Sequence, residues 1–569
     1  MQNTLVFMLA ALWVLTGCTA EKTVEKPNIL IILADDLGYS DLGCYGSEIQ
    51  TPNLDQLAEN GLRFTQFYNS ARCCPSRAAL LTGLFPHQAG IGSFAGGGRG
   101  LPGYMGRLTP NALTLGEVMQ ENGYRTFGSG KWHVNNPGPT ERGFEEFYGF
   151  LKDYGVDGWE PKWMKRYPEG RAERKYKEGE FFATNVITDY ALDFLKLSET
   201  TPEQPWLLYL SYQVVHFPLQ APQADILKYK DTYTVGWDTI RARRFKRMKA
   251  LGVIPPHIPL SERSDIPLPE VATRNGVPGD GLHNPPWDLL DTDRQADLAR
   301  RMAVFAGMLD NMDQNIGRVI QHLKDQGTLD NTLILFMSDN GSCAEWDPFG
   351  FEYPSYEARV AGGTPNHPNV LHTGDSLDLL GGPDGPLFSL GSGWANVGNT
   401  PFTLYKQFVH EGGISSPLIM HWPASIKEPQ VFTEGYAHFV DVMATCVEVG
   451  GGQYPLSYQG EAKSPMEGTS LFKILDGQGS PDRVLAFEHQ GTPAIRVGDW
   501  KLVSRNRQSM LENGFSETAE FELYNIAEDR SETQNLAGEY PEKVEELKEK
   551  MLEEFRRTKI FPRPGPKKS

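Results

Sequence analysis

Two adjacent cysteines stand in front of a proline, a serine and an arginine in the stretch ARCCPSRAALLTG, residues 71–83. The pattern predicts that Cys73 lies at the front of a helix, where the helix dipole and free backbone N–H groups stabilise a thiolate or another anion. Arg77 follows one helical turn later and can face the same anion. The residue types alone leave three interpretations open: a structural thiol, a metal ligand, or a nucleophile with His133 or His216 as its base.

A second group of candidate residues consists of polar side chains that directly follow apolar runs. Asp35 and Asp36 come after NILIILA, and Asp339 and Asn340 come after TLILFMS. Oxygen ligands of this kind suit a hard cation such as Ca²⁺ or Mg²⁺. Adjacent aspartates repel each other unless a cation lies between them, so the sequence predicts a metal ion here. A zinc site is disfavoured because paired histidines and Cys-x-x-Cys spacings are missing.

These apolar runs are typical of buried strands in a largely parallel sheet. Two further strands are predicted at YRTFGSG, which leads to Lys131 and His133, and at WLLYLSY, which His216 follows. In open α/β sheets, ligands bind beyond the carboxyl ends of the strands. We therefore expect four strand ends to bring their polar residues to one site.

Helical patterns alternate with the strands. Residues 51–61 and 114–123 both have the layout of short helices that end at a glycine. Apolar residues spaced three and four apart from Met302 to Leu323 predict a long helix. Residues 221–300 and 343–400 are rich in Pro, Gly or charge, and we expect them to form long loops.

The C-terminal part of the chain has a different pattern. After a candidate linker near 450–470, the runs VLAFEH, AIRVGDWKLVS and FELYNI predict a small antiparallel sheet, and a charged helix follows from about Pro541. The apolar side of this helix is formed by Val544, Leu547, Met551 and Phe555. We therefore expect a catalytic α/β domain over 27–455, with helices on both faces of its sheet, and an α+β subdomain over 470–560.

The stretch CCPSRAALLTG resembles the signature of the type I sulfatases, Cys-x-Pro-Ser-Arg followed by Thr-Gly. Further marks of this family appear in the expected order between residue 27 and about 560: ILADDLGYSDLGCYG, TPNLDQLA, GKWH, SDNG and NTPFTLYKQFVHEGGISSP. The resemblance implies the alkaline-phosphatase-like fold. It also implies that a separate formylglycine-generating enzyme converts Cys73 to formylglycine, so that an oxygen atom and not sulfur ligates the metal.

The same resemblance assigns roles to individual residues. It implies one Ca²⁺ ion with the ligands Asp35, Asp36, Cys73 in its modified form, Asp339 and Asn340. The residues that it places around the nucleophile and the sulfate are Arg77, Lys131, His133, His216 and Lys406. Lys406 is chosen because it precedes the Glu411 of EGG by five residues, as the lysine of the family does.

The resemblance implies hydrolysis of sulfate monoesters, on sulfated carbohydrates or aryl alcohols, to an alcohol and inorganic sulfate. One hydroxyl of the formylglycine hydrate, activated by the metal and Asp339, attacks sulfur, while His216 protonates the leaving alcohol. His133 then takes a proton from the remaining hydroxyl, which expels sulfate from the sulfo-enzyme intermediate and restores the aldehyde. Ca²⁺, Lys131 and Lys406, with Arg77, are expected to stabilise the developing charge.

Two alternatives remain open. A phosphonate or phosphate diester hydrolase of the same superfamily can use the same modified cysteine with a transition metal. A non-catalytic glycan-binding lipoprotein with a decayed site is the other alternative, although every motif position named above is filled.

Composition and the N-terminus bear on partners and location. The net charge of −18 over 569 residues argues against a nucleic-acid partner, which requires a basic surface. Residues 1–17 contain an apolar run followed by LTGC, which is typical of a lipoprotein-type signal peptide with a lipid anchor at Cys18 and a tether over 18–26. An ordinary signal peptide is the alternative. Both predict an exported protein, periplasmic or anchored to the outer membrane of a bacterium, with no other membrane contact.

The remaining cysteines and histidines have simpler interpretations. Cys44, Cys343 and Cys446 are expected to be buried or paired thiols. His87 and His410 are expected to be hydrogen-bonded structural residues. The glycine-rich GIGSFAGGGRG lacks the Gly-Lys-Ser/Thr ending of a phosphate-binding loop, and we expect it to shape the mouth of the pocket.

Overall fold

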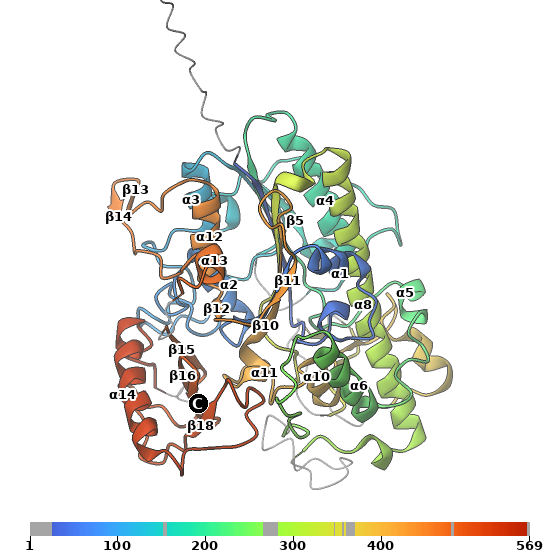
Figure 1. The fold of residues 1–569 in the computed structure, drawn as a ribbon. Coiled ribbons are helices and arrows are strands. Elements are labelled where there is room, and N and C mark those ends of the chain that lie inside the picture. Colours follow the sequence, from blue (N-terminus) through green and yellow to red (C-terminus); the bar gives the residue numbers. More distant parts are fainter. Residues whose placement is uncertain are drawn as a thin grey trace, which may run out of the picture.

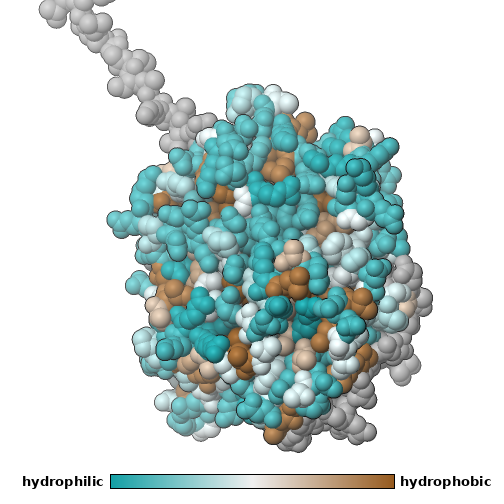
Figure 2. All heavy atoms as spheres, turned by 90° about the vertical axis from the view of Figure 1, so that its right-hand side faces the viewer, coloured by the Kyte–Doolittle hydropathy of each residue, from teal (hydrophilic) through white to brown (hydrophobic). Residues whose placement is uncertain are grey.

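The computed structural model describes residues 26–151, 156–265, 283–345, 348–355, 358–359, 370–479 and 483–565. The predicted signal peptide, Cys18 and nearly all of the predicted tether lie outside these residues. Within the described part of the chain, no helix has both the length and the apolar character needed to cross a bilayer. On the face shown in Figure 2, hydrophilic side chains predominate and apolar ones form only small groups.

A large mixed sheet runs through the centre of the molecule (Figure 1). Its strand order is β11-β2-β10-β7-β1-β6-β3-β4-β5, and β12 pairs with β2. The strands are β1 (Asn28–Ala34), β2 (Leu62–Tyr68), β3 (Arg125–Lys131), β4 (Glu146–Phe150), β5 (Lys165–Tyr167), β6 (Trp206–Ser211), β7 (Thr332–Ser338), β10 (Ser415–His421), β11 (Gln430–Phe432) and β12 (Ala437–His438). Neighbours pair in parallel, except that β10 is antiparallel to β2 and β7 and β5 is antiparallel to β4.

Strand β1 shows why a continuous apolar run is needed at the centre of this sheet. Side chains alternate between the two faces of a strand. Leu30 and Ile32 belong to one hydrophobic core, whereas Ile29, Ile31 and Leu33 belong to another. Both faces of the strand are therefore covered, as expected for a parallel sheet.

Helices cover both faces of the sheet, and the predicted fold class is confirmed (Figure 1). The first core includes residues of α1 (Pro52–Glu59), α4 (Ala183–Ser198), α5 (Gln223–Leu227) and α8 (Thr292–Asp325). The second core includes residues of α2 (Cys73–Thr82), α3 (Leu115–Glu121), α12 (Asp441–Val449) and α13 (Leu471–Leu475). The predicted long helix is α8, which begins earlier than expected, at a cap where the Asp291 side chain accepts a hydrogen bond from the Arg294 N–H.

The prediction of a long loop over 221–300 is wrong in part. This region contains α5, the 14-residue helix α6 (Trp237–Ala250) and the start of α8. The sequence of α6 gives a weak apolar pattern because part of its buried face is arginine: Arg244 pairs with Asp41 at 2.5 Å and with Glu48 at 2.8 Å. The described part of 343–400 holds only short elements, which are β8 (Glu352–Tyr353), a 3-10 helix (Gly374–Leu379), β9 (Leu387–Phe388) and α10 (Ser392–Gly398).

The C-terminal sheet is antiparallel and four-stranded, as predicted. Its strands are β15 (Val484–His489), β16 (Thr492–Val497), β17 (Trp500–Val503) and β18 (Glu522–Asn525). One face packs against α14 (Pro541–Arg557) through Ile495, Leu502 and Leu523, and the predicted apolar side of α14 completes this core. The other face contributes Leu485 and Phe487 to the second core of the main body.

The remaining elements are short. They are α11 (Glu411–Ile414), the hairpin of β13 (Ser457–Tyr458) and β14 (Glu461–Ala462), and single 3-10 turns at Gly43–Tyr45, Pro139–Arg142, Pro161–Trp163, Trp287–Leu289 and Leu329–Asn331.

A glycine substitution tests the close pairing of β3 with β6. Gly130 has a φ of +111°, and a Cβ there would lie 1.8 Å from the Ser211 carbonyl oxygen. We expect Gly130→Ala to lower the free energy of unfolding by at least about 2 kcal/mol. Gly123→Ala is the matched control, because Gly123 also has a positive φ but nothing lies within 4 Å of its Cβ position. Its expected loss is about 1 kcal/mol. Equal losses in urea denaturation would contradict the explanation.

Candidate active site

The predicted strand-end residues come together at one edge of the sheet. Asp35 and Asp36 follow β1, and Asp339 and Asn340 follow β7, its parallel neighbour, with Ala34 opposite Ser338. The Asn340 side-chain amide donates to Asp36 Oδ1 at 2.7 Å, and the Asp36 N–H donates to Asp339 Oδ1 at 3.2 Å. All four side chains are buried.

Three cationic side chains from three different elements meet these carboxylates. Lys131 Nζ, at the end of β3, lies 2.5 Å from Asp35 Oδ2. Lys406 Nζ, which precedes α11, lies 2.7 Å from Asp36 Oδ1. The Arg77 guanidinium, on α2, donates to Asp339 Oδ2 at 2.8 Å through Nε, and its Nη2 lies 2.8 Å from the same oxygen. The structure thus joins residues that lie more than 300 positions apart in the sequence.

Further hydrogen bonds hold the Arg77 guanidinium in place. Its Nη1 donates to the Lys131 carbonyl at 2.9 Å and to Ser211 Oγ at 2.5 Å. Burial alone would lower the pKa of Arg77, but Asp339 together with Tyr209, Asp35 and Cys73 outweighs this effect, and the pKa is raised. Arg77 therefore stays charged and ties α2 to the ends of β3, β6 and β7.

Burial disfavours the negative charges of Asp35 and Asp339. Burial raises the pKa of Asp35 well above its ordinary value, and the charges of Asp339 and Asp36 add to the effect against Lys131 and Arg77. Burial also raises the pKa of Asp339 against the charge of Arg77. Asp36 differs, because Lys406 and His216 overcome its burial and lower its pKa to about 2. A further cation at this edge would relieve the repulsion.

Two buried oxygen atoms fit such a cation. Asp35 Oδ1 and Asn340 Oδ1 have no hydrogen-bond partner among the described residues. Buried polar atoms are usually hydrogen-bonded or coordinate a metal. The donors here are oxygens of carboxylates and one amide, which suit Ca²⁺ or Mg²⁺ better than a soft metal. The residues present therefore fit the predicted hard-metal site.

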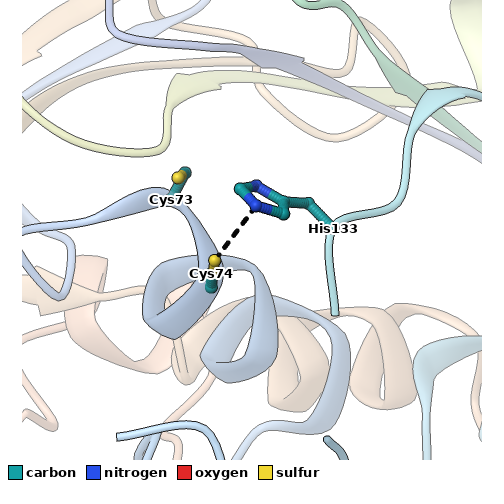
Figure 3. Close-up of side chains that lie close together, drawn as sticks. All are labelled: Cys73, Cys74 and His133. Atoms are coloured by element: carbon teal, nitrogen blue, oxygen red, sulfur yellow. Dashed lines mark hydrogen bonds between the residues drawn. The ribbon is translucent and has the colours of Figure 1, made fainter. Parts of the chain in front are cut away.

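Cys73 is the first residue of α2 and is 1% exposed. A hydrogen bond from Cys74, together with the charges of His133, Lys131 and Lys406, overcomes burial and lowers the pKa of the Cys73 thiol well below its ordinary value. Figure 3 shows the His133 ring beside both cysteines, and its Nε2 lies 3.2 Å from Cys74 Sγ. The negative charge of Cys73 raises the pKa values of Asp36 and Asp339, so the thiol lies close to the predicted metal ligands.

The two histidines of the predicted set, His133 and His216, are both buried, and their neighbours differ. Burial lowers the pKa of His133 to about 4, although the charge of Cys73 works against it. His216 Nε2 lies 3.6 Å from Asp36 Oδ2, and its Nδ1 bonds to the Phe217 carbonyl at 2.6 Å. Burial lowers the pKa of His216 well below its ordinary value, and Asp36 opposes this shift.

Several non-glycine residues at the site have a positive φ, which is an unfavourable backbone conformation for them. Non-glycine residues with positive φ are uncommon, and they gather where function demands a particular geometry. Five of them lie in or beside the site: Asp36 (65°), Ala71 (59°), His133 (56°), Leu404 (62°) and Gln407 (84°). These conformations could not be predicted from the sequence, because none of the five residues is glycine.

The residues left out of the catalytic set have structural partners. His87 lies 2.9 Å from Glu488, and His410 lies 2.8 Å from Glu522. No described cysteine forms a disulfide: Cys44 and Cys446 are buried, and Cys343 is partly exposed. Sequence analysis missed Arg72 and His489, which are buried near Cys73 but belong to no recognised motif.

Comparison with known proteins places this arrangement in a family. The Sulfatase family model matches residues 27–452. The chain belongs to the sulfatase family. A second model, for the C-terminal region of N-sulphoglucosamine sulphohydrolase, matches residues 402–559 of this sulfatase.

Relatives of this sulfatase cover most of its length. An uncharacterized sulfatase of Schizosaccharomyces pombe is 33% identical over 563 residues, or 93% of each chain. An arylsulfatase of Klebsiella aerogenes is 32% identical over 81% of this chain and 94% of its own. This protein is accordingly an arylsulfatase-like hydrolase.

Solved structures share the fold at lower identity. BT4656, in complex with its substrate D-glucosamine-2-N, 6-O-disulfate, matches with a TM-score of 0.59 and 20% identity over 95% of this chain and 100% of its own. Ps i-CgsB, in complex with k-i-k-neocarrahexaose, matches with a TM-score of 0.60 and 22% identity over 95% of this chain and 94% of its own.

Removal and return of a metal ion test the predicted ligands. We expect chelation to lower the thermal stability of the protein and added Ca²⁺ to restore it, by about 2.7 kcal/mol at a concentration of 100 times Kd. Asn340→Ala should weaken this response, because it removes one ligand oxygen without changing the charge. Asn396→Ala, which removes a buried amide that bonds to Ser264 instead, should keep the full response. A response to transition metals but not to Ca²⁺ would contradict the assignment.

Proposed function

We propose that this sulfatase hydrolyses sulfate monoesters to an alcohol and inorganic sulfate through a formylglycine hydrate at position 73 and a sulfo-enzyme intermediate. The observation that carries the proposal is the place of Cys73, which begins α2 within the signature CCPSR and lies beside buried carboxylates, lysines and histidines. In this proposal a separate formylglycine-generating enzyme supplies the modification. The sulfur of Cys73 then marks where the two hydroxyl oxygens of the hydrate would lie.

The proposed cofactor is one Ca²⁺ ion. Its proposed ligands are Asp35, Asp36, the modified residue 73, Asp339 and Asn340. When bound, the ion supplies a Lewis acid that withdraws charge from the sulfate oxygens and from the attacking hydroxyl.

The lysines and Arg77 act on the sulfate group. A sulfate monoester carries one negative charge, which shifts toward the bridging oxygen as the S–O bond breaks. Lys131 and Lys406 are buried and held at fixed positions, so they can donate to these oxygens without reorganisation. Burial opposes the charge of Lys406, but Asp36 raises its pKa well above the ordinary value, so it remains protonated.

His216 is the proposed donor to the leaving alcohol. Its Nδ1–H donates to the Phe217 carbonyl, which fixes the ring and leaves Nε2 on the side of Asp36. The substrate brings a further negative charge next to Asp36, and this charge raises the pKa of His216 from its depressed value. Nε2 can then carry the proton that the bridging oxygen receives.

His133 is the proposed base of the second step. Its pKa of about 4 leaves it neutral at pH 7, so it can accept a proton. That proton comes from the hydroxyl which did not attack sulfur. The electron pair of that O–H bond forms the aldehyde C=O as the bond from carbon to the sulfated oxygen breaks, and inorganic sulfate leaves. A plain serine has no second hydroxyl and could not release sulfate in this way.

Sulfated glycan fragments are the first candidate substrates, and aryl sulfates are the second. The substrate of BT4656 is a sulfated sugar, and that protein shares the fold. We also propose export, with or without a lipid at Cys18 and on a bacterial host, from the apolar run that precedes that residue.

Modification of residue 73 can be measured directly. We expect mass spectrometry of the peptide that contains residue 73 to show a loss of about 18 Da relative to the thiol. Cys73→Ala should abolish hydrolysis of 4-nitrophenyl sulfate, whereas Cys446→Ala, which removes another buried thiol, should retain it. Full activity with an intact thiol at position 73 would exclude the mechanism. Faster turnover of an aryl phosphonate than of the aryl sulfate would favour the diesterase alternative.

The contribution of Lys406 can be separated from that of surface charge. We expect Lys406→Ala to lower kcat/KM for an aryl sulfate by about 10²–10³, because a buried, preorganised donor is lost. Lys427→Ala removes an exposed lysine that donates to the Pro423 carbonyl, and it should leave kcat/KM within about twofold of the wild type. Similar rates for both variants would remove Lys406 from the proposed set.

A further inference from the structure

Two buried side chains near Cys73 have hydrogen-bonding atoms that the proposed reaction does not use. Arg72 precedes Cys73 as the N-cap residue of α2, and His489 ends β15 in the C-terminal sheet. They are 6% and 0% exposed. Arg72 Nε and both ring nitrogens of His489 have no hydrogen-bond partner among the described residues. Since buried polar atoms are nearly always hydrogen-bonded, these three atoms indicate a place that a ligand completes.

The two side chains lie close together and close to Cys73. The Phe94 ring lies 4.4 Å from the Arg72 guanidinium carbon and 6.2 Å from the His489 ring. Burial lowers the pKa of His489 to about 3, and the charges of Arg72 and Arg507 add to this shift, while those of Glu488 and Cys73 oppose it. His489 is therefore a neutral imidazole, which offers one donor and one acceptor.

Phe94 also lines a cavity of about 1100 Å³. The other lining residues come mainly from the glycine-rich loop, at 92–97 and Arg99, and from the C-terminal part of the chain. Ala95, one of its lining residues, also hydrogen-bonds through its backbone to the Cys74 thiol. The cavity therefore begins next to Cys74, the residue that follows the proposed nucleophile. Ligand pockets commonly measure about 300–1,000 Å³, so this one has room for more than a single ring.

The charged side chains that line the cavity are three arginines, Arg99, Arg507 and Arg563, and two glutamates, Glu488 and Glu512. Arg507 is exposed on the cavity wall, and its Nη2 donates to Gln407 Oε1 at 2.9 Å. Gln407 follows Lys406 directly. Arg72 forms a long ion pair, 3.7 Å, with Glu345. The buried Glu488 of the same cavity is already matched by His87 at 2.9 Å and Arg563 at 3.3 Å.

We propose that Arg72 and His489 bind the alcohol part of the substrate, and that Arg507 binds a second anionic group on it. The leaving alcohol is then a sugar whose hydroxyl groups pair with the neutral imidazole. Its second anionic group, a carboxylate or a further sulfate, pairs with a guanidinium. The assignment rests on the proposed sulfatase reaction at residue 73 and narrows its substrate class to acidic glycan fragments.

The test compares three kinds of substrate with each variant. The probes are 4-nitrophenyl sulfate, hexose monosulfates with the sulfate at each position, and doubly charged sugars. The doubly charged set has two arms, hexose disulfates and sulfated disaccharides that contain a uronate, which distinguish a sulfate from a carboxylate at Arg507. Mass spectrometry of residue 73 confirms equal modification in every variant. Arg72 is not substituted because it adjoins the modification signature.

We expect His489→Ala to lower kcat/KM for the sugar sulfates by about tenfold or more, and for the aryl sulfate by less than about threefold. His489→Gln, which keeps a donor and an acceptor, should recover part of the loss. Arg507→Ala should raise KM about tenfold for the doubly charged sugars only. Arg505→Ala is the matched control, because Arg505 lies in the same segment but pairs with Asp265 at 2.5 Å. It should behave as the wild type.

Two results would overturn the assignment while the sulfatase reaction stands. One is an equal loss on aryl and sugar sulfates in His489→Ala, which would mean that His489 only supports the fold around Cys73. The other is an Arg507→Ala variant that does not distinguish singly from doubly charged sugars. Arg507 is exposed, so this second variant is informative even if His489→Ala fails to fold. A wild type that hydrolyses no sulfate ester would overturn the proposed function itself, and the assignment with it.

Discussion

The site depends on balancing buried charges at the carboxyl ends of β1 and β7. Three carboxylates lie there out of contact with water, and such groups are stable as ions only when cations and hydrogen bonds match them. Lys131, Lys406 and Arg77 supply that match from β3, the segment before α11, and α2. The pairing also positions the cations, so the same contacts that make the fold possible hold three donors at fixed places around Cys73.

A second buried ion cluster connects Lys406 to the C-terminal subdomain. Glu411, five residues after Lys406, lies 2.9 Å from Lys501 of β17 and 3.0 Å from Arg530. Lys501 in turn lies 2.8 Å from Glu532. Burial alone would raise the pKa of Glu411, but these cations lower it to about 2. The C-terminal sheet is therefore bonded to the segment that carries Lys406, and the family model for the C-terminal region includes that segment, since it begins at residue 402.

The sequence predicted the strands that are continuous apolar runs, and also β3, whose run YRTFGSG follows a predicted helix. β1, β6 and β7 are continuous apolar runs, and the rule for strand ends brought Asp35 and Asp339 together across 304 positions. β2 and β10 were not predicted, since LRFTQFY and SSPLIMH mix polar with apolar residues. The helix α6 was missed because arginines form part of its buried face.

The residues of the candidate site also fall into those that the sequence predicted and those that it did not. Residues within the motif were identified because the motif is local in sequence. Arg72 and His489 could not be, because their place beside Cys73 depends on how the C-terminal sheet packs against the main body. No local pattern around either residue records that packing.

The proposed two-step reaction needs an acid and a base that differ in protonation although both are histidines. Burial lowers the pKa of both histidines and the charge of Lys131 adds to this, so the position of each ring relative to Asp36 distinguishes them. His216 lies 3.6 Å from Asp36 and gains a proton most readily when the substrate adds negative charge there. For His133, Asp36 is not among the main influences, and Cys74 is its close neighbour instead. One carboxylate can thus separate the two roles, because environments that push two pKa values apart assign the acid and the base.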